Sequence, residues 1–149
     1  EDARKQAQAE GKAEPDWPRL FQQAGKAMDA NDYFAARAAY EQGLVALGTA
    51  GGPDPADVAV RTTLRNVRYN LACISARASA GRDRPGALVG SVPAGEAARL
   101  RDAAFAHLEE AIRCGWSNAG HLAKDADLAP LRDDPRWPGL LERVRSGGK

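Results

Sequence analysis

The sequence predicts an all-α fold, and three observations support this prediction. Alanine is very frequent while aromatic residues make up only 6% of the chain, a composition that suits closely packed helices. Apolar residues recur at spacings of three and four, the period of an α-helix. No run of alternating β-branched residues is long enough to form a strand. With 149 residues, the chain is expected to form one domain whose core needs no disulfide or metal.

The domain is predicted to span residues 15–146. Residues 1–14 are charged and rich in alanine but lack a consistent apolar face, so we expect a flexible or frayed leader. Residues 147–149 are expected to form a short tail.

A first helical hairpin is predicted over residues 15–48. Asp16 can cap its first helix, which is expected to end at Asn31, and Asp32 can cap the second helix, with Gly48 closing it. Because the turn between the two helices is so short, they must lie antiparallel. Apolar positions at helical spacing define the inner faces of the pair: Leu20, Phe21, Ala24, Ala27, Met28, Tyr33, Ala36, Ala39, Tyr40, Gly43, Leu44 and Leu47.

A second hairpin is predicted over residues 55–114. Asp54, Pro55 and Asp57 have the pattern of a helix start: a capping residue, a first-turn proline and an acid that completes a capping box. The helix that follows is expected to run to Gly81 and, at about 1.5 Å per residue, to be about 36 Å long. It should therefore be the central helix of the stack. Its apolar stripe consists of Val60, Leu64, Val67, Leu71, Ile74 and Ala78.

The partner helix of this second hairpin is predicted from Ala97 to Cys114. Its apolar face consists of Leu100, Ala104, Leu108, Ala111 and Ile112. Residues 81–95 lie between the two helices and are rich in Gly, Pro and Arg, so we expect an inserted loop there.

Short helices are predicted over residues 116–146, and we expect them to form a cap. Asp134 and Pro135 are expected to start the final helix in the same way as Asp54 and Pro55. The cap can cover the exposed apolar face of the second hairpin with Leu122, Leu128, Leu131, Trp137, Leu140 and Leu141.

The first hairpin resembles a tetratricopeptide repeat. In such repeats small residues lie where helix axes cross closely and large residues fill the space between successive hairpins. The family usually has alanine at the position of Gly43. The matching positions here are Leu20, Ala24, Asn31, Asp32, Tyr33, Ala36, Tyr40 and Gly43.

The resemblance continues to about Val144. The run from Tyr69 to Cys73 looks like the first helix of another repeat, and Ala104, Leu108 and Ala111 follow the pattern of its second helix. Residues 115–137 look like the segment that closes many bacterial tetratricopeptide arrays. The resemblance implies a stack of two antiparallel hairpins with a helical cap.

The resemblance also implies a binding surface. In such stacks the first helix of each hairpin lines a concave face on which peptides usually bind. Asn70 matches the asparagine that hydrogen-bonds a peptide main chain in many of these domains, and an amide can both donate and accept. A structural hydrogen bond between hairpins is the alternative for Asn70. The expected exposed positions are Gln22, Met28, Asp29, Asn66, Tyr69, Asn70 and Arg77.

The residues show no catalytic constellation. Nucleophilic catalysis needs a Ser, Cys or Thr beside an oriented His, and only His107 and His121 are available. We expect both to be surface or packing residues. Cys73 and Cys114 are too few for a disulfide framework and lack metal-ligand spacing, so we expect small buried packing residues, with a redox pair as the alternative.

Two charged patterns have ordinary explanations. Helix capping accounts for several of the carboxylates in the cap, which lack the glycine and the closing glutamate of a calcium loop. These carboxylates are Asp125, Asp127, Asp133 and Asp134. Arg61, Arg65 and Arg68 form a basic stripe that could bind phosphates. We expect this stripe to pair instead with acids such as Asp102, Glu109 or Glu110.

We therefore expect a non-catalytic module that binds a protein or peptide, without a cofactor or metal. The net charge of +1 gives no reason to expect nucleic acid, and no apolar run is long enough to span a membrane. Two alternatives stay open: a structural or scaffolding domain that packs against another domain of a longer protein, and a thiol-dependent enzyme. Because the chain starts at Glu1, we expect that an N-terminal piece has been removed. The compartment would be the cytoplasm or, if that piece was a signal peptide, the periplasm or the outside of the cell.

Overall fold

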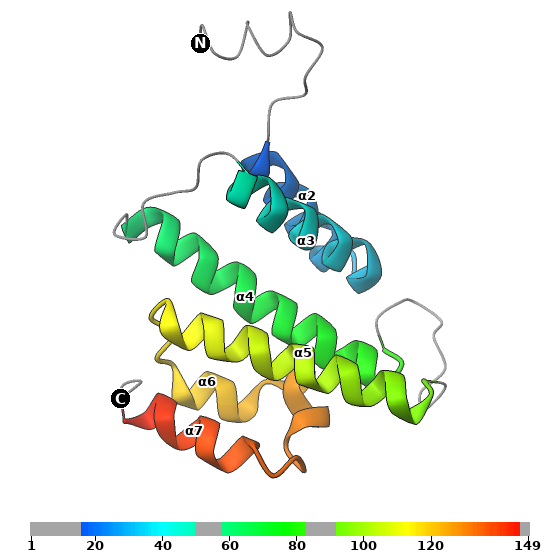
Figure 1. The fold of residues 1–149 in the computed structure, drawn as a ribbon, viewed down its shortest axis with the longest axis vertical. Coiled ribbons are helices and arrows are strands. Elements are labelled where there is room, and N and C mark those ends of the chain that lie inside the picture. The colour runs from blue at the N-terminus through cyan, green and yellow to red at the C-terminus, as the bar shows by residue number, and fades with distance from the viewer. Residues whose placement is uncertain (1–15, 50–57, 83–91, 147–149) are drawn as a thin grey trace, which may run out of the picture.

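The computed structural model describes residues 16–49, 58–82 and 92–146, and within these ranges every regular element is a helix (Figure 1). The all-α prediction is therefore confirmed. The elements are α2 (Trp17–Asp29), α3 (Tyr33–Thr49), α4 (Val58–Ser79), α5 (Ala94–Arg113), α6 (Ala119–Lys124), the 3-10 helix η1 (Ala126–Leu131) and α7 (Trp137–Arg145). None of these helices is both long enough and apolar enough to cross a membrane.

The start of α2 and the turn into α3 follow local sequence signals. Asp16 accepts a hydrogen bond from the backbone N–H of Arg19 at 3.2 Å, as expected of an N-cap. Asn31 has a φ of 59°, and the Asp32 carboxylate accepts from the backbone N–H of Ala35 at 3.1 Å. The predicted capping residues and tight turn are thus confirmed. Gly48 does not close α3, because the helix continues to Thr49.

Helix α4 is shared between two apolar clusters. On one side Val67, Leu71 and Ile74 pack with residues of α2 and α3. On the other side Tyr69, Ala72, Cys73 and Ala76 pack with α5 and the C-terminal helices. The single stripe expected from the sequence is therefore only part of the pattern, since α4 is buried along two faces.

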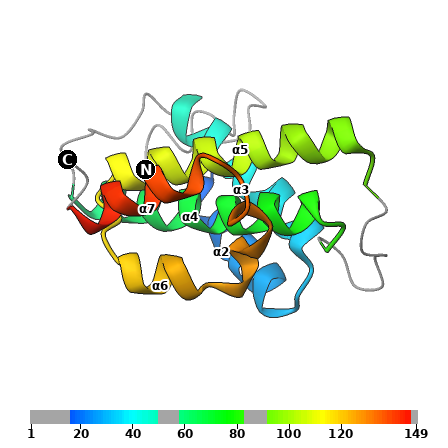
Figure 2. The same ribbon diagram turned by 90° about the horizontal axis from the view of Figure 1, so that it is seen from below.

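The layers are visible in two views. In Figure 1, α2 and α3 lie at one end of the molecule, α4 and α5 in the middle, and α6 and α7 at the other end. Seen from below in Figure 2, α5 lies on one side of α4, and α6 with η1 lies on the other. Helix α6 and η1 thus approach α4 along the side that α5 leaves open.

Helix α6 and the 3-10 helix η1 each begin at a capping side chain. Asn118 accepts from the backbone N–H of His121 at 3.0 Å at the start of α6, and Asp125 caps η1. The apolar side chains of α6, η1 and α7 are buried in the second cluster: Leu122, Leu128, Leu131, Trp137, Leu140 and Val144.

The predicted start of the last helix is wrong. The helix begins at Trp137, with Pro138 in its first turn, and Arg136 is the N-cap residue. Asp134 lies two residues before the N-cap, and its carboxylate accepts from the backbone N–H and the guanidinium of Arg136.

Several predictions fall outside the described residues. These are the leader over 1–14, the capping pattern at Asp54, Pro55 and Asp57, and the tail over 147–149. The predicted insertion at 81–95 is described only at its two ends, and α5 starts at Ala94, inside its predicted limits.

Candidate functional site

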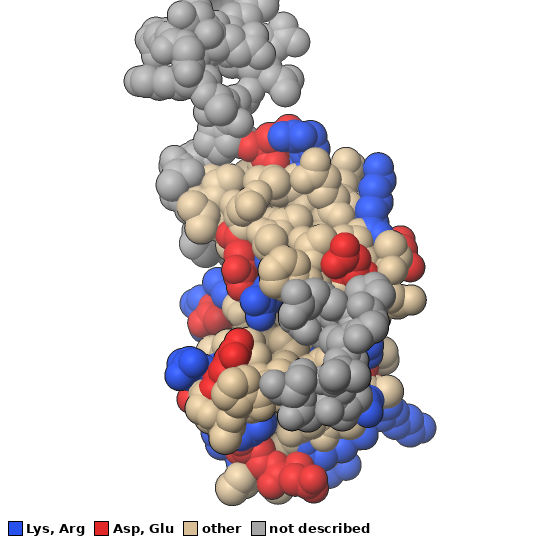
Figure 3. All heavy atoms as spheres, turned by 90° about the vertical axis from the view of Figure 1, so that its right-hand side faces the viewer, with Lys and Arg blue, Asp and Glu red and all other residues tan. Residues whose placement is uncertain are grey.

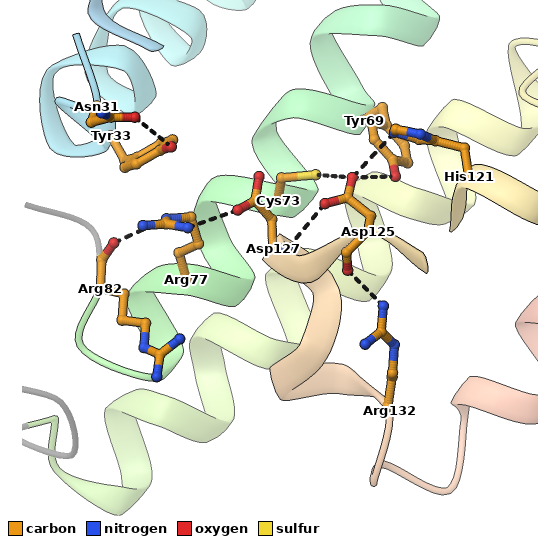
Figure 4. A network of polar contacts seen from close by, with 10 residues as sticks. All are labelled: Asn31, Tyr33, Tyr69, Cys73, Arg77, Arg82, His121, Asp125, Asp127 and Arg132. Atoms are coloured by element: carbon orange, nitrogen blue, oxygen red, sulfur yellow. Dashed lines mark hydrogen bonds and ion pairs between the residues drawn. The ribbon is translucent and has the colours of Figure 1, made fainter. Parts of the chain in front are cut away.

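Polar side chains from three elements meet at the carboxylate of Asp125 (Figure 4). Its Oδ2 atom accepts a hydrogen bond from the Tyr69 hydroxyl at 2.7 Å and one from the Cys73 thiol at 3.6 Å. The same oxygen lies 3.3 Å from Nε2 of His121. Its Oδ1 atom accepts from the backbone N–H of Asp127 at 3.0 Å. One side chain at the junction of α6 and η1 therefore holds the C-terminal segment against α4.

The spacing of residues on α4 explains this arrangement. Tyr69, Cys73 and Arg77 follow one another at intervals of four, so they lie on one side of the helix. Asp125 and Asp127 face this row. Arg77 forms an ion pair with Asp127 through Nη1 and Oδ1 at 2.7 Å, and both side chains are only about a quarter exposed (27% and 26%).

Arg77 also connects the cap to the first hairpin. Its guanidinium carbon lies 4.1 Å from the centre of the Tyr33 ring, a cation–π geometry, and its Nε atom donates to the backbone carbonyl of Arg82 at 3.1 Å. Tyr33 in turn donates from its hydroxyl to Asn31 Oδ1 at 3.1 Å (Figure 4). The network therefore reaches from the α2–α3 turn to η1.

Tyr69 is buried, contrary to the expectation that it lies on an exposed surface. Its side chain is only 5% exposed, because the Trp116 ring stacks on it with the ring centroids 3.8 Å apart. His121 lies against both rings at 5.7 and 5.9 Å. Tyr69 is thus a core residue that uses its hydroxyl to hold Asp125.

The surroundings of Cys73 disfavour a reactive thiolate. Burial raises the pKa of the thiol strongly, and the negative charges of Asp125 and Asp127 raise it further. Because the thiolate is the nucleophilic form, a thiol held protonated and bonded to a carboxylate is a poor nucleophile. Both cysteines are free thiols. Cys114 is partly exposed, whereas the sequence predicted that it would be buried.

His107 lies outside the network around Asp125 and pairs with Arg68. Its Nδ1 atom lies 3.1 Å from Nη1 of Arg68, between α5 and α4. Burial, together with the positive charge of Arg68, lowers the His107 pKa to about 4. The ring is therefore neutral at pH 7 and can accept a hydrogen bond from the guanidinium.

Three side chains in the network are of the metal-ligand type. The nearest ligand atoms of Cys73, Asp125 and Asp127 lie within 4.8 Å of one another. The Asp127 carboxylate is already paired with Arg77, and Asp125 accepts from a phenol and a thiol. Protein groups therefore already satisfy both carboxylates.

The sequence-predicted surface residues of α4 lie between the two apolar clusters. Asn66 is exposed, and Asn70 and Arg77 are half-buried. Asn70 donates from Nδ2 to the Tyr40 hydroxyl of α3 at 3.0 Å. This is the hydrogen bond between hairpins that the sequence left as an alternative. We call Asn66, Asn70 and Arg77 the α4 polar row.

The predicted residues of α2 differ in exposure. Gln22 and Asp29 are exposed, whereas Met28 is half-buried against the first cluster. Tyr40 has a raised pKa chiefly because it is buried, and the nearby negative charge of Asp29 adds to the effect.

The acids that we expected to pair with Arg61, Arg65 and Arg68 form ion pairs with other arginines. Asp102 pairs with Arg136 at 3.0 Å, and Glu109 pairs with Arg143. Arg113 holds Glu110 and is the largest cause of the lowered pKa of that carboxyl. Figure 3 shows acidic and basic side chains interspersed over one side of the molecule, without a large patch of one sign.

Sequence reasoning did not foresee that Trp116, His121 and Asp125 gather around Tyr69 and Cys73. The available signal was the interval of four between Tyr69 and Cys73, which puts a phenol and a thiol on one helical face. That signal does not say which later segment supplies their acceptor.

In comparisons with protein-family models, with curated proteins and with solved structures, no match to this chain was found.

Proposed function

We propose that this chain is a non-catalytic module that binds a protein or an extended peptide along the α4 polar row. In this proposal the two hairpins and the cap form a tetratricopeptide-like stack. Its binding face consists of the α4 polar row together with the exposed Gln22 and Asp29 of α2.

The observation that carries the proposal is the position of the α4 polar row. Asn66, Asn70 and Arg77 lie between two apolar clusters that occupy the other faces of α4. Asn66 and Asn70 are one helical turn apart, about 6 Å along the axis. Alternate residues of an extended peptide are about 6.6 Å apart, so two successive main-chain groups on one side of a peptide can meet the two amides.

The chemistry of Asn70 fits this role. Its Nδ2 atom donates to Tyr40, and within the described residues no donor reaches its Oδ1 atom. An amide oxygen without a protein donor can accept a hydrogen bond from a peptide N–H and does not require a particular side chain.

The surroundings of the sulfur and imidazole groups support a non-catalytic role. Cys73 is held as a thiol beside Asp125, and His107 pairs with Arg68. Neither forms the nucleophile–base pair that acyl transfer requires.

A structural or scaffolding role is the second candidate, and the internal bonds of the same row favour it. Asn70 bonds Tyr40, and Arg77 binds Asp127 and lies over Tyr33. In this alternative these side chains hold the hairpins and the cap together and bind no peptide.

The experiment that separates the two candidates is a binding screen on an array of diverse extended peptides. Asn66→Ala and Asn70→Ala are each expected to weaken the peptides that bind by at least about fivefold, since each removes about 1 kcal/mol of hydrogen bonding. Tyr40→Phe is the matched control, because it removes the internal hydrogen bond but keeps the Asn70 amide.

We expect Tyr40→Phe to leave binding within about twofold while costing about 1 kcal/mol of stability. Unchanged binding in both asparagine variants would contradict the peptide-binding proposal. A wild-type chain that binds no peptide on the array, together with equal losses of stability in Tyr40→Phe and Asn70→Ala, would support the scaffolding role.

A further inference from the structure

Sulfur, oxygen and nitrogen atoms that can bind a metal converge from α4, α6 and η1 (Figure 4). The Cys73 sulfur and one carboxylate oxygen each of Asp125 and Asp127 lie within 4.8 Å of one another. Nε2 of His121 lies 3.3 Å from Oδ2 of Asp125. Cys73 is buried and both carboxylates are partly buried, so the group differs from a cluster of exposed surface acids. A thiolate, an imidazole and carboxylates are the ligands that zinc uses in proteins.

The distances at Asp125 Oδ2 fit a tetrahedral zinc ion. Zinc lies about 2.3 Å from sulfur and about 2.0 Å from nitrogen or oxygen, so two ligand atoms of a tetrahedral site are about 3.3–3.6 Å apart. Here the Cys73 sulfur is 3.6 Å from Oδ2, and Nε2 of His121 is 3.3 Å from it. Two of the separations between ligand atoms therefore already have the values that a zinc site requires.

Asp125 Oδ2 is approached by more groups than it can accept hydrogen bonds from. A carboxylate oxygen has two lone-pair sites. Three groups surround this one: the Tyr69 hydroxyl at 2.7 Å, the His121 nitrogen at 3.3 Å and the Cys73 thiol at 3.6 Å. A zinc ion bound to the sulfur, the nitrogen and this oxygen would use one lone-pair site and leave the other to the Tyr69 hydroxyl.

The remaining contacts of the two carboxylates can stay in place when an ion binds. Asp125 accepts from the backbone N–H of Asp127 through Oδ1, and Asp127 accepts from Arg77 through its own Oδ1. Each carboxylate therefore has one oxygen fixed by a protein donor, while its second oxygen can bind an ion. Hydrogen bonds of this kind orient the ligands of metal sites.

We propose that Cys73, His121, Asp125 and Asp127 form a zinc site that fastens the C-terminal segment to α4. Zinc replaces the proton of the Cys73 thiol, and that proton is released to solvent. Because four protein ligands complete the tetrahedron, the site is structural and not catalytic. The proposal goes beyond peptide binding by the α4 polar row and does not depend on it.

The ion can enter from the solvent side of the site. The His121 side chain is 53% exposed and that of Asp127 is 26% exposed, whereas Cys73 is only 3% exposed. Zinc can therefore bind first to the imidazole and a carboxylate and then reach the sulfur. His121 is the most exposed of the four, so its ring has the most freedom to turn and complete the site.

Isothermal titration calorimetry of the full chain with Zn²⁺ tests the proposal. One ion is expected to bind per chain, and Mg²⁺ should not compete because it prefers oxygen ligands. Cys73→Ser should weaken zinc binding at least about a hundredfold, since a hydroxyl can still donate to Asp125 but is a poor zinc ligand. Cys114→Ser is the matched control: it removes the other thiol and should leave the affinity unchanged.

Cobalt(II) in place of zinc identifies the ligands. Cobalt bound to a thiolate gives a charge-transfer band in the near ultraviolet, which is expected in the wild-type chain and in Cys114→Ser but not in Cys73→Ser. His121→Ala should keep this band and weaken binding at least about tenfold. Circular dichroism verifies that each metal-free variant remains helical.

The wild-type chain gives a readout that does not depend on any variant. Bound zinc should slow the alkylation of Cys73 and leave that of Cys114 unchanged, because only the Cys73 sulfur binds the ion.

Four results would overturn the proposal. The first is a wild-type chain that binds no zinc at about 100 μM. The second is an equal effect of Cys73→Ser and Cys114→Ser. The third is an unchanged zinc affinity in His121→Ala. The fourth is a Cys73 alkylation rate that zinc leaves unchanged.

Discussion

His107 shows how burial and a neighbouring charge act on a single ionisable group. The ring lies between α4 and α5, where Arg68 donates to it and Glu110 lies nearby. Desolvation is the main cause of its lowered pKa, the positive charge of Arg68 lowers it further, and the charge of Glu110 opposes the shift.

We predict that stability falls as the pH is lowered from about 6.5 to about 4. The folded-state pKa of His107 is about 4, below the unfolded value near 6.5, so the unfolded chain binds a proton first. The stabilising contribution is complete above pH 6.5, is lost as the pH falls towards 4, and is of the order of 2 kcal/mol. Urea denaturation at about pH 7, 5.5 and 4.5 measures it.

His107→Gln is the control for this prediction, since glutamine does not titrate and can still accept from Arg68. The variant should lose less stability than the wild type between pH 7 and pH 4.5. Equal losses in the two chains would show that other groups dominate the acid sensitivity.

For single residues, the sequence predicted a side chain's role correctly where that side chain bonds to backbone groups close to it in the chain. Asp16 and Asp32 bond backbone groups three residues away, so their roles follow from local patterns. Asp125 bonds Tyr69 and Cys73, which are 56 and 52 residues away. Contacts over such separations depend on how helices pack, and no local pattern encodes that.

Among the elements, the α2–α3 hairpin depends on a close approach at Gly43. A Cβ atom at this position would lie 2.4 Å from Cε1 and 2.7 Å from Cδ1 of Phe21. The Phe21 ring lies between Trp17 and Tyr40, with ring centroids 5.7 and 6.1 Å away, so it has little freedom to move. This contact explains why glycine occupies this position.

We predict that Gly43→Ala destabilises the chain by about 1–2 kcal/mol, although alanine is the better helix former, because overpacking outweighs the gain in helix propensity. Gly25→Ala on α2 is the matched control, since nothing lies within 4 Å of the added Cβ. It should stabilise the chain by about 0.5–1 kcal/mol. Thermal denaturation of both variants gives the comparison.

Shortening Phe21 to Leu in the Gly43→Ala chain should recover part of the loss, because it removes the ring atoms that the new methyl meets. A Gly43→Ala variant that is as stable as Gly25→Ala would show that the ring moves aside freely.

The elements also show where periodicity was insufficient. The spacing of Val67, Leu71 and Ile74 predicted one apolar face of α4, but Tyr69 and Cys73 are buried on another. A helix packed on two sides has apolar residues over much of its circumference, and a search for one stripe finds only one face. The start of α7 was placed too early because Pro135 and Pro138 both follow the pattern of a first-turn proline, and the helix uses Pro138.

For the whole molecule, the order of two hairpins followed by short C-terminal helices was predictable because each unit is local in sequence. The way in which the last segment closes on the rest was not. Arg136 lies 4.2 Å from the centre of the Phe105 ring and pairs with Asp102 at 3.0 Å, which attaches α7 to α5. Asp125 and Asp127 attach the start of η1 to α4. Each attachment joins residues more than 30 positions apart.

The unequal burial of the two cysteines makes them a natural reporter of transient cap opening. A maleimide can alkylate the partly exposed Cys114 in the native state, whereas Cys73 is only 3% exposed and is held by Asp125. Cys73 should therefore be alkylated only when the C-terminal helices detach from α4, and its labelling rate would report how often they do. Asp125→Asn should accelerate alkylation of Cys73 and leave that of Cys114 unchanged, as peptide mass mapping over time would show. Equal labelling rates for both cysteines in the wild-type chain would mean that the cap does not shield Cys73 in solution.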